Sequence, residues 1–216
     1  MTDSIRTKRT ELHRLSNRGA YDREAIYSIL DEGLVCHVGI VFEGAPFVIP
    51  TGYGRSGDQL FIHGSSASRM LRTLSEGADA CITVTLIDGL VLARSVFHHS
   101  MNYRSVLVLS KGTLIDEPEA KIEALRLITE RLVPGRWDDV RHPTPQEMQA
   151  TSVIAFSINE GSAKIRIGPP KDDEADYALQ IWAGVLPLLF TTGAPIPDER
   201  NLDGVTLPSY IRDYKR

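Results

Sequence analysis

The sequence is poor in cysteine, has no excess of positive charge and contains no long apolar run, and each absence excludes a class of protein. Its two cysteines, Cys36 and Cys81, lie in apolar stretches, so we interpret them as core residues. Two cysteines cannot form a disulfide scaffold or a four-thiolate zinc site. The formal net charge is −4, whereas surfaces that bind nucleic-acid phosphates are basic. We therefore expect no nucleic-acid partner.

A membrane-spanning helix needs about 18 or more apolar residues in a row, and no segment approaches that length. Residues 1–20 are polar and lack the apolar centre of a signal peptide. We therefore expect a cytoplasmic protein that does not associate with a membrane. The chain has 216 residues, of which 42% are hydrophobic and 24% are charged. These values are typical of a globular protein whose core needs no metal or disulfide.

Composition divides the chain into three segments. Residues 1–20 carry five Lys or Arg among few apolar side chains, which predicts a flexible basic arm in solvent. Residues 21–168 hold the predicted strands and helices and are interpreted as a single domain. Residues 169–216 contain an acidic cluster followed by an apolar run over 181–190. They are too few for a core of their own, so we expect them to pack on the domain or on a second subunit.

Short strands connected by turns dominate the middle segment. Apolar and polar residues alternate with a period of two, which is typical of a strand with one buried face. Strands that follow one another through short turns indicate an antiparallel barrel or α+β fold rather than a parallel sheet. Helices are predicted from Asp22 to a left-handed stop at Gly33, over 66–76, and from Asp116 to about residue 134. Strands are predicted over residues 34–42, 46–50, 59–63, 80–87, 106–109, 151–158 and 163–167, with turns at 43–44, 57–58 and 88–89.

The most informative motif runs from His63 to Arg69, where a strand ends, a glycine and three serines follow, and a helix begins. Free N–H groups and the positive end of the helix dipole attract an anion at such a position. Serine hydroxyls add donors, and the guanidinium of Arg69 suits a phosphate. The alternative is that a serine caps the helix and Arg69 is solvated. The Gly-Lys-Ser/Thr of a nucleotide-binding P-loop is absent.

Two further stretches are candidates for the lining of a pocket. Pro50, within the run 48–53, marks an edge strand whose backbone groups are free to bind a ligand; the alternative is an ordinary strand end. Polar residues 97–105 directly precede the apolar strand at 106. The adjacent His98 and His99 would point to opposite faces of a strand, so we predict no metal site. The Gly-x-Ser-x-Gly pattern of a serine nucleophile does not occur.

In this order, the stretches resemble the flavin-binding split barrels of the pyridoxamine 5′-phosphate oxidase-like superfamily, and more narrowly its branch grouped with nitroimidazole-resistance proteins. The resemblance implies a mainly β fold with flanking helices, a six-stranded antiparallel split barrel. It also implies a homodimer with FMN bound at the subunit interface. The resemblance covers roughly residues 20–190 and is carried by residues 21–23, 36–39, 48–51, 60–69, 102–106 and 182–185.

The same resemblance assigns residues to the cofactor. The backbone of residues 49–51 would meet the isoalloxazine ring, and the serines and arginine of residues 66–69 would hold the FMN phosphate. Arg104 and Ser105 match an Arg-Gln pair that lies against the flavin, with serine in place of glutamine here. Trp182 would come from the partner subunit, or would be a core or interface aromatic. The complete expected set is Ile49, Pro50, Thr51, His63, Ser65, Ser66, Ser68, Arg69, Asn102, Tyr103, Arg104, Ser105 and Trp182.

The expected function is that of an FMN-dependent oxidoreductase acting on a small molecule, with FAD, haem or deazaflavin as alternative ligands. A non-catalytic flavin binder or carrier is the second hypothesis. No catalytic residue is assigned, and His63, His98 and Tyr103 are candidates for acid–base chemistry by residue type alone. True oxidases hold the substrate phosphate with an Arg-x-His segment that residues 208–216 lack, so oxidation of pyridoxamine phosphate is not expected. We expect local positive charge at Arg69 and Arg104.

Overall fold

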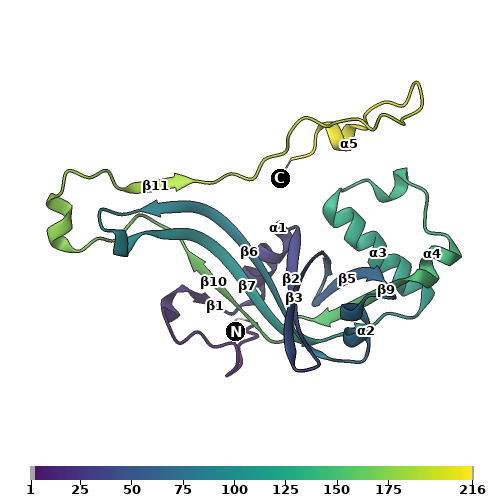
Figure 1. Ribbon diagram of the computed structural model, residues 1–216, viewed down its shortest axis with the longest axis horizontal. Coiled ribbons are helices and arrows are strands. Elements are labelled where there is room, and N and C mark those ends of the chain that lie inside the picture. The colour runs from purple at the N-terminus through teal and green to yellow at the C-terminus, as the bar shows by residue number, and fades with distance from the viewer. Residues whose placement is uncertain (1–2, 216) are drawn as a thin grey trace.

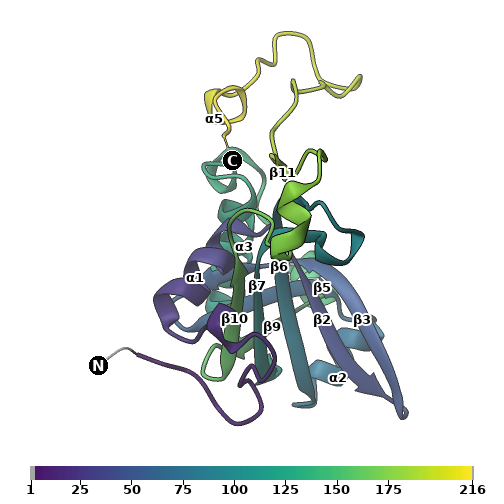
Figure 2. The same ribbon diagram turned by 90° about the vertical axis from the view of Figure 1, so that its left-hand side faces the viewer.

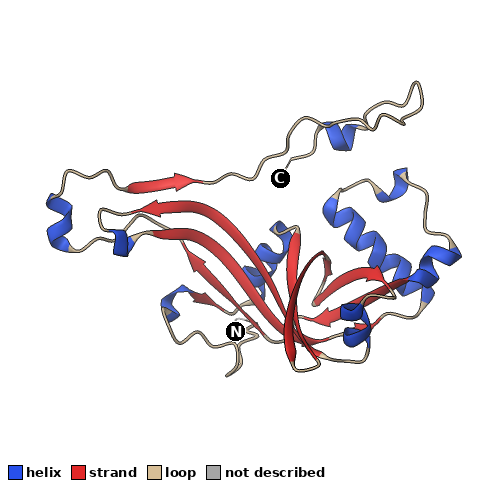
Figure 3. Cartoon of the chain, in the orientation of Figure 1, coloured by secondary structure: helices blue, strands red, loops and turns tan. Residues whose placement is uncertain are grey.

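Two antiparallel sheets share one hydrophobic core in the computed structural model, which describes residues 3–215 (Figure 1). The larger sheet has the strand order β1-β10-β7-β6-β2-β3, with β11 paired to β6, and the smaller sheet has the order β4-β5-β9-β8. Helices lie outside the sheets, and strands dominate the centre of the molecule (Figure 3). The predicted fold, mainly antiparallel β with flanking helices, is confirmed.

Most elements are short, and only β6 and β7 exceed ten residues among the described strands. The strands are β1 Gly19–Ala20, β2 Val35–Phe42, β3 Ala45–Gly52, β4 Gly54–Ser56, β5 Gln59–Ser65, β6 Asp79–Leu92, β7 Ser100–Lys111, β8 Thr113–Leu114, β9 Thr151–Ser157, β10 Gly161–Arg166 and β11 Gly184–Pro187. The α-helices are α1 Arg23–Glu32, α2 Arg69–Ser75, α3 Pro118–Leu132, α4 Pro145–Ala150 and α5 Ser209–Arg212, and the 3-10 helices are η1 Ser16–Arg18, η2 Val96–His98, η3 Trp137–Asp139 and η4 Glu174–Ala178. Within residues 3–215, none of the helices has the length and apolar character needed to cross a membrane.

Strand β2 shows how the alternating pattern builds the core. Cys36, Val38 and Ile40 are buried, while the residues between them face outward. Burial raises the pKa of the Cys36 thiol to about 12, so the thiol is protonated at neutral pH and packs as a small apolar group. Cys81 differs from the expectation, because it is only half-buried. It pairs with Gly39, one of the outward-facing positions of β2, and therefore shares the outer face of the sheet.

Helix α1 begins as predicted and ends differently. The Asp22 carboxylate accepts a hydrogen bond from the Ala25 N–H at 2.8 Å, which caps the helix. Gly33 follows the helix with φ −66°, so it is not the left-handed stop that was expected. A Cβ at this position would lie 2.4 Å from Val84 Cγ1 and 2.9 Å from the Tyr53 hydroxyl. Glycine is therefore required for close packing of the helix end, not for its backbone conformation.

We expect Gly33→Ala to destabilise the fold by about 1–3 kcal/mol, the range for overpacking a filled core. Both neighbours of the new methyl group, Tyr53 and Val84, are 1% exposed and have no room to move. In a chain of this size each kcal/mol lowers the melting temperature by about 2–4 °C, which thermal unfolding followed by circular dichroism measures. Gly193→Ala is the control, since a Cβ there meets nothing within 4 Å. Equal melting temperatures for the two variants would contradict the packing argument.

Strand β6 continues where the sequence predicts a turn. Asp88 and Gly89 lie within it, and its pairing with β7 shifts register between Ile87 and Gly89. Such an irregularity is a β-bulge, which lets a strand bend and continue. β6 and β7 therefore project beyond the barrel as a two-stranded arm that ends at η2 (Figure 1). Residues 102–105, expected just before a strand, lie inside β7, and His98 lies in η2 rather than in a strand.

The N-terminal segment is not the solvated arm that its composition predicts. Ile5 is only 4% exposed and belongs to the main core. Arg9 forms an ion pair with Glu160, and Gly19–Ala20 form the edge strand β1 next to β10. Burial of Ile5, backbone pairing and the two ion pairs Arg9–Glu160 and Asp3–Arg23 fix this short basic segment against the barrel. The described part of this segment therefore belongs to the barrel (Figure 2).

The C-terminal segment leaves the barrel and covers little of it. Asp172 ties its start to the arm, accepting hydrogen bonds from the Arg94 backbone N–H at 2.9 Å and guanidinium at 3.0 Å. Gly184–Pro187 pair with β6 as β11, and the chain then returns toward α3 (Figure 1). The apolar run over 181–190 stays largely exposed, with Leu189 83% accessible. Residues 184–187 of the run pair with β6 of their own chain, and packing of the run on a second subunit stays a prediction.

Candidate functional site

Strand β3 and helix α2 meet around Arg69. The guanidinium carbon of Arg69 lies 4.1 Å from the centre of the Phe47 ring and 5.2 Å from that of Phe42. This cation–π arrangement holds the side chain in place. Arg69 is exposed, and it takes part in no ion pair within residues 3–215. Its charge is therefore fixed in position and available to an anion.

The serines before α2 fold into a tight corner. The Ser65 hydroxyl accepts a hydrogen bond from the Ala67 N–H at 3.2 Å, and the Ser68 N–H donates to the Ser65 carbonyl at 2.9 Å. The Ser66 N–H donates to the Ala150 carbonyl at 2.9 Å, which joins the corner to the end of α4. Ser68 occupies the N-cap position, yet its side chain forms no capping hydrogen bond. The alternative that a serine caps this helix is not realised, so the Ser68 hydroxyl can donate to a ligand.

Strand β3 is the edge of the larger sheet. Ile49 packs against the core, whereas Pro50 is exposed and pairs with His37 of β2. Thr51 is half-buried, and its hydroxyl donates to the Gly52 carbonyl at 3.2 Å. Backbone groups on the open side of an edge strand have no partner strand, and proline is tolerated there. The strand that carries the open edge of residues 49–51 also holds the cation of Arg69, through Phe47.

His63 lies in β5, opposite Val153 of β9. Its imidazole reaches solvent, but surrounding residues desolvate it enough to lower its pKa below the usual 6.5 because burial disfavours the charged form. The side chain is therefore neutral at pH 7, which is the form that accepts a proton or binds a metal ion. No group of three or more His, Cys, Asp and Glu side chains in residues 3–215 is arranged to hold a metal ion.

Arg104 is held by two carboxylates. Its guanidinium donates to Glu32 at the end of α1 and to Asp88 in the bulge of β6, at 2.7 Å in each case. The hydrogen bonds that Arg104 donates to Glu32 and then to Asp88 raise its pKa, and the bond accepted from Arg104 lowers the pKa of Glu32. The three side chains sum to one negative charge. Contrary to the expectation, Arg104 does not make this part of the protein locally positive.

We expect this ion pair to add acid sensitivity to the fold. The pKa of Glu32 is lower in the folded chain than its ordinary 4.5. Its contribution to stability is therefore present above that value and is lost as the pH falls through the folded pKa. Glu32 is half-exposed, so Glu32→Gln should cost about 1 kcal/mol or less at pH 7 and cost less below pH 4. Melting temperatures across pH 3–7 measure this, with Glu24→Gln on the same helix as the control. A loss for Glu32→Gln that does not change with pH would refute the linkage.

One chain does not bring all the expected cofactor residues together. β7, which carries residues 102–105, is separated from β3 by β6 and β2. Three strand spacings correspond to about 14 Å. Trp182 precedes β11 near the far end of the arm, where it is 69% exposed. The structure thus groups β3 with α2, places residues 102–105 beside β10, and leaves Trp182 apart from both.

Sequence reasoning missed two cations that flank β7. In the pairing of β10 with β7, Arg166 lies opposite Tyr103 and Lys164 lies opposite Ser105. Arg166 is 9% exposed, and its guanidinium donates to the Asn102 side-chain oxygen. The spacing of Lys164 and Arg166 in the sequence could have indicated this pair of cations, because residues two apart in a strand share a face.

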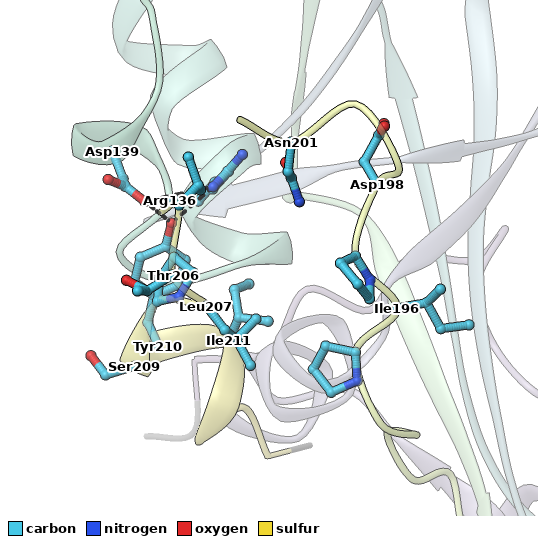
Figure 4. A pocket seen from close by; sticks show the side chains of 14 residues that line it. Arg136, Asp139, Ile196, Asp198, Asn201, Thr206, Leu207, Ser209, Tyr210 and Ile211 are labelled. Atoms are coloured by element: carbon cyan, nitrogen blue, oxygen red, sulfur yellow. Dashed lines mark hydrogen bonds and ion pairs between the residues drawn. The ribbon is translucent and has the colours of Figure 1, made fainter. Parts of the chain in front are cut away.

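Two cavities open on the described part of the molecule. One of about 1090 Å³ lies between η3 and the C-terminal segment and is lined by Arg136, Asp139 and residues 195–198 and 205–211 (Figure 4). The Tyr210 hydroxyl joins its two sides, accepting from Arg136 at 2.9 Å and donating to Asp139. A second cavity of about 320 Å³ is a groove on the outer face of β2, β3 and β6. Neither cavity is lined by an expected cofactor residue.

Two features define the class of protein. The fold is mainly β, and its edge strand β3 contacts Arg69, the first residue of helix α2. The sequence profile described as Pyridoxamine 5′-phosphate oxidase matches residues 22–165. The chain therefore belongs to the pyridoxamine 5′-phosphate oxidase family, and the resemblance noted in its sequence is confirmed. A search of curated proteins found no match.

Solved structures include relatives over nearly the whole chain. The flavocytochrome Anf3 from Azotobacter vinelandii is 42% identical, with 98% of each chain covered and a TM-score of 0.92. The FAD and haem binding protein from Mycobacterium smegmatis is 38% identical over 92% of this chain and 97% of that chain, with a TM-score of 0.88. A candidate 5-nitroimidazole antibiotic resistance protein from Bacteroides thetaiotaomicron is 25% identical over 68% and 86%, with a TM-score of 0.58. The first two match the C-terminal segment as well as the barrel.

Proposed function

We propose that this chain is a flavin-dependent redox protein that binds FAD together with haem. The observation that carries the proposal is the similarity, over at least 92% of the chain, to a flavocytochrome and to an FAD and haem binding protein. The sequence resemblance implied FMN. We prefer FAD because one of these relatives is named for it, and the experiment below separates the two flavins. A small molecule is the proposed electron donor or acceptor.

The corner of β3 and α2 fits a flavin. The guanidinium of Arg69 and the hydroxyl of Ser68 are placed to bind a phosphate at the start of α2. The open edge of β3 around Pro50 would lie along the isoalloxazine ring. When bound, the flavin supplies hydride or electron transfer. The side chains of this chain bind and orient it and exclude water.

The chain also has residues of the kinds that bind haem. Haem iron takes an imidazole as an axial ligand, and its ring requires apolar surroundings. His63 offers a neutral imidazole at the end of β5, next to the α2 corner. The exposed run that includes Ile181, Trp182 and Phe190 offers apolar side chains without a partner on the described surface of this chain. Bound haem would supply electron transfer or oxygen chemistry.

We further propose a homodimer in which a second copy completes each site. Two observations support it. The expected cofactor residues fall in separate places within one chain, and the apolar run of the C-terminal segment is exposed. Contiguous exposed apolar patches commonly mark protein interfaces. Sedimentation velocity should give twice the mass of the chain, and a monomer that binds both cofactors would contradict the dimer.

The absorbance spectrum of the purified protein tests the proposal. We expect the two bands of an oxidised flavin together with a haem Soret band. Acid release of the flavin followed by chromatography distinguishes FAD from FMN. A colourless protein that neither FAD, FMN nor haem stabilises against heat would overturn the proposal. Flavin bands that bleach with a reductant but are not restored by oxygen or quinones would favour a non-catalytic carrier.

A further inference from the structure

Three cations gather at the junction of β1, β10 and β7. Lys164 and Arg166 lie on one face of β10, opposite Ser105 and Tyr103 of β7. On the other side of β10, β1 pairs Gly19 with Lys164. This pairing brings the preceding residue, Arg18, alongside β10. The pKa of Arg166 is lowered by burial and then by the positive charge of Arg18, as expected for two cations close together. We name Arg18, Lys164 and Arg166 the β10 cation cluster.

Arg166 is buried without a carboxylate. It is 9% exposed, and its guanidinium donates to three neutral oxygens: the side-chain oxygen of Asn102 and the carbonyls of Gly168 and Pro169, the last two at 3.2 Å. Neutral acceptors satisfy hydrogen bonds but leave the charge uncompensated. A buried charge with no counter-charge is costly, so this position favours an anion.

Three acids on elements next to β10 and β7 pair with other cations. Glu160 pairs with Arg9, and Glu32 and Asp88 both pair with Arg104. Arg18, Lys164 and Arg166 take part in no ion pair in the described part of the chain. The cluster therefore keeps three positive charges in a chain whose formal net charge is −4.

The surface beside the cluster is suited to a ligand with a flat apolar part. Tyr103 lies opposite Arg166 on one side and opposite Ile87 of β6 on the other. Directly paired residues of antiparallel strands share a face. Ile87 is 41% exposed, so an aromatic ring and a solvent-exposed aliphatic side chain share a face of the sheet with Lys164 and the buried Arg166 across three strands.

We propose that the β10 cation cluster binds the phosphate or carboxylate groups of a ligand whose apolar part lies along Tyr103 and Ile87. The identity of that ligand rests on the proposed function, in which the anionic groups are the diphosphate of FAD or the propionates of haem. The prediction that the cluster binds an anion does not depend on the proposed function. Arg69 is on the other side of the sheet order, beyond β2 and β3, so the cluster is a second anion site.

Inorganic pyrophosphate tests the site without a cofactor. At constant ionic strength, pyrophosphate should raise the melting temperature of the full-length protein, and calorimetry should show saturable binding. Arg166→Gln and Arg18→Gln should each weaken this binding tenfold or more, because a hydrogen bond to a charged group contributes about 1.5–3 kcal/mol. Arg166 also donates hydrogen bonds to the carbonyls of Gly168 and Pro169, so the Arg166→Gln variant can fail to fold. Arg18 is half-buried, and Arg18→Gln is the variant on which the test depends. Arg14→Gln, an exposed arginine before η1, is the matched control and should bind normally.

Paired ligands then identify the anion. If Arg18→Gln weakens FAD but not riboflavin, the cluster binds the flavin diphosphate. If it weakens haem but not haem dimethyl ester, the cluster binds the propionates. The proposal is overturned if pyrophosphate does not bind, if Arg14→Gln weakens it as much as Arg18→Gln, or if the variants lose self-association while anion binding is unchanged. In that last case acids of a second copy would fill the cluster. Failure of the wild type to bind FAD and haem would refute the proposed function and leave the pyrophosphate result standing.

Discussion

His63→Ala should abolish the haem Soret band of the purified protein while its flavin bands persist. The iron of haem is held by axial ligands, and His63 offers an accessible imidazole that its lowered pKa keeps neutral at pH 7. Removing the imidazole would leave the iron without this ligand. Absorbance at equal protein concentration, with the haem-to-flavin ratio as the readout, measures the effect. Because protons compete with iron for the imidazole, wild-type haem should be released only as the pH falls through this lowered pKa.

Four of the other five histidines are compared with His63. His98 lies beside an acid, His99 contacts a backbone carbonyl and His142 packs on an indole ring. His37 is exposed on β2 and is the matched substitution, since His37→Ala also removes an exposed imidazole from a strand. A Soret band that survives in His63→Ala and disappears in His37→Ala would assign the ligand to His37 instead.

Arg69→Ala should weaken FAD or FMN about 10- to 150-fold and leave riboflavin binding nearly unchanged. The factor corresponds to the 1.5–3 kcal/mol of a hydrogen bond to a charged group. The side chain is held on the Phe47 ring at 4.1 Å, so little conformational entropy is lost when it meets a phosphate. Riboflavin has no phosphate and should not respond. Quenching of flavin fluorescence during titration of the apoprotein gives the three dissociation constants.

Arg72→Ala is the control for this effect. Arg72 is exposed in the last turn of the same helix, so its removal changes the net charge equally without touching the start of the helix. Equal losses for phosphorylated flavins in the two variants would show a general electrostatic effect. Equal losses for riboflavin and FAD in Arg69→Ala would show that Arg69 supports the fold of the corner instead of binding phosphate.

Local sequence patterns predicted the elements well where neighbouring residues decide the structure. Alternation over residues 34–42 placed β2 and its buried face, because side chains of a strand alternate between faces. Asp22 caps α1 because a cap depends on residues within one turn. The bulge at Asp88 was missed because a turn signal and a bulge share the same residues, and the pairing of β6 with β7 over its whole length decides between them.

The candidate site could be predicted in part for the same reason. The corner of Ser68 and Arg69 was found because strand, serines and helix start are contiguous. Arg104 was expected to be an available cation, but Glu32 and Asp88, each distant in sequence, neutralise it. No local pattern reports a carboxylate that arrives from another element.

The sequence by itself determined that this is a mainly β chain of the pyridoxamine 5′-phosphate oxidase family with an anion-suited corner at Arg69, because period, caps and contiguous motifs act over a few residues. Only the tertiary structure decided which charges remain available. Strand pairing placed Arg166 beside Tyr103 without an acid and gave Arg104 two acids. It also left the apolar run of the C-terminal segment exposed, since a charge or an apolar surface is compensated by its neighbours in space, whatever their distance along the chain.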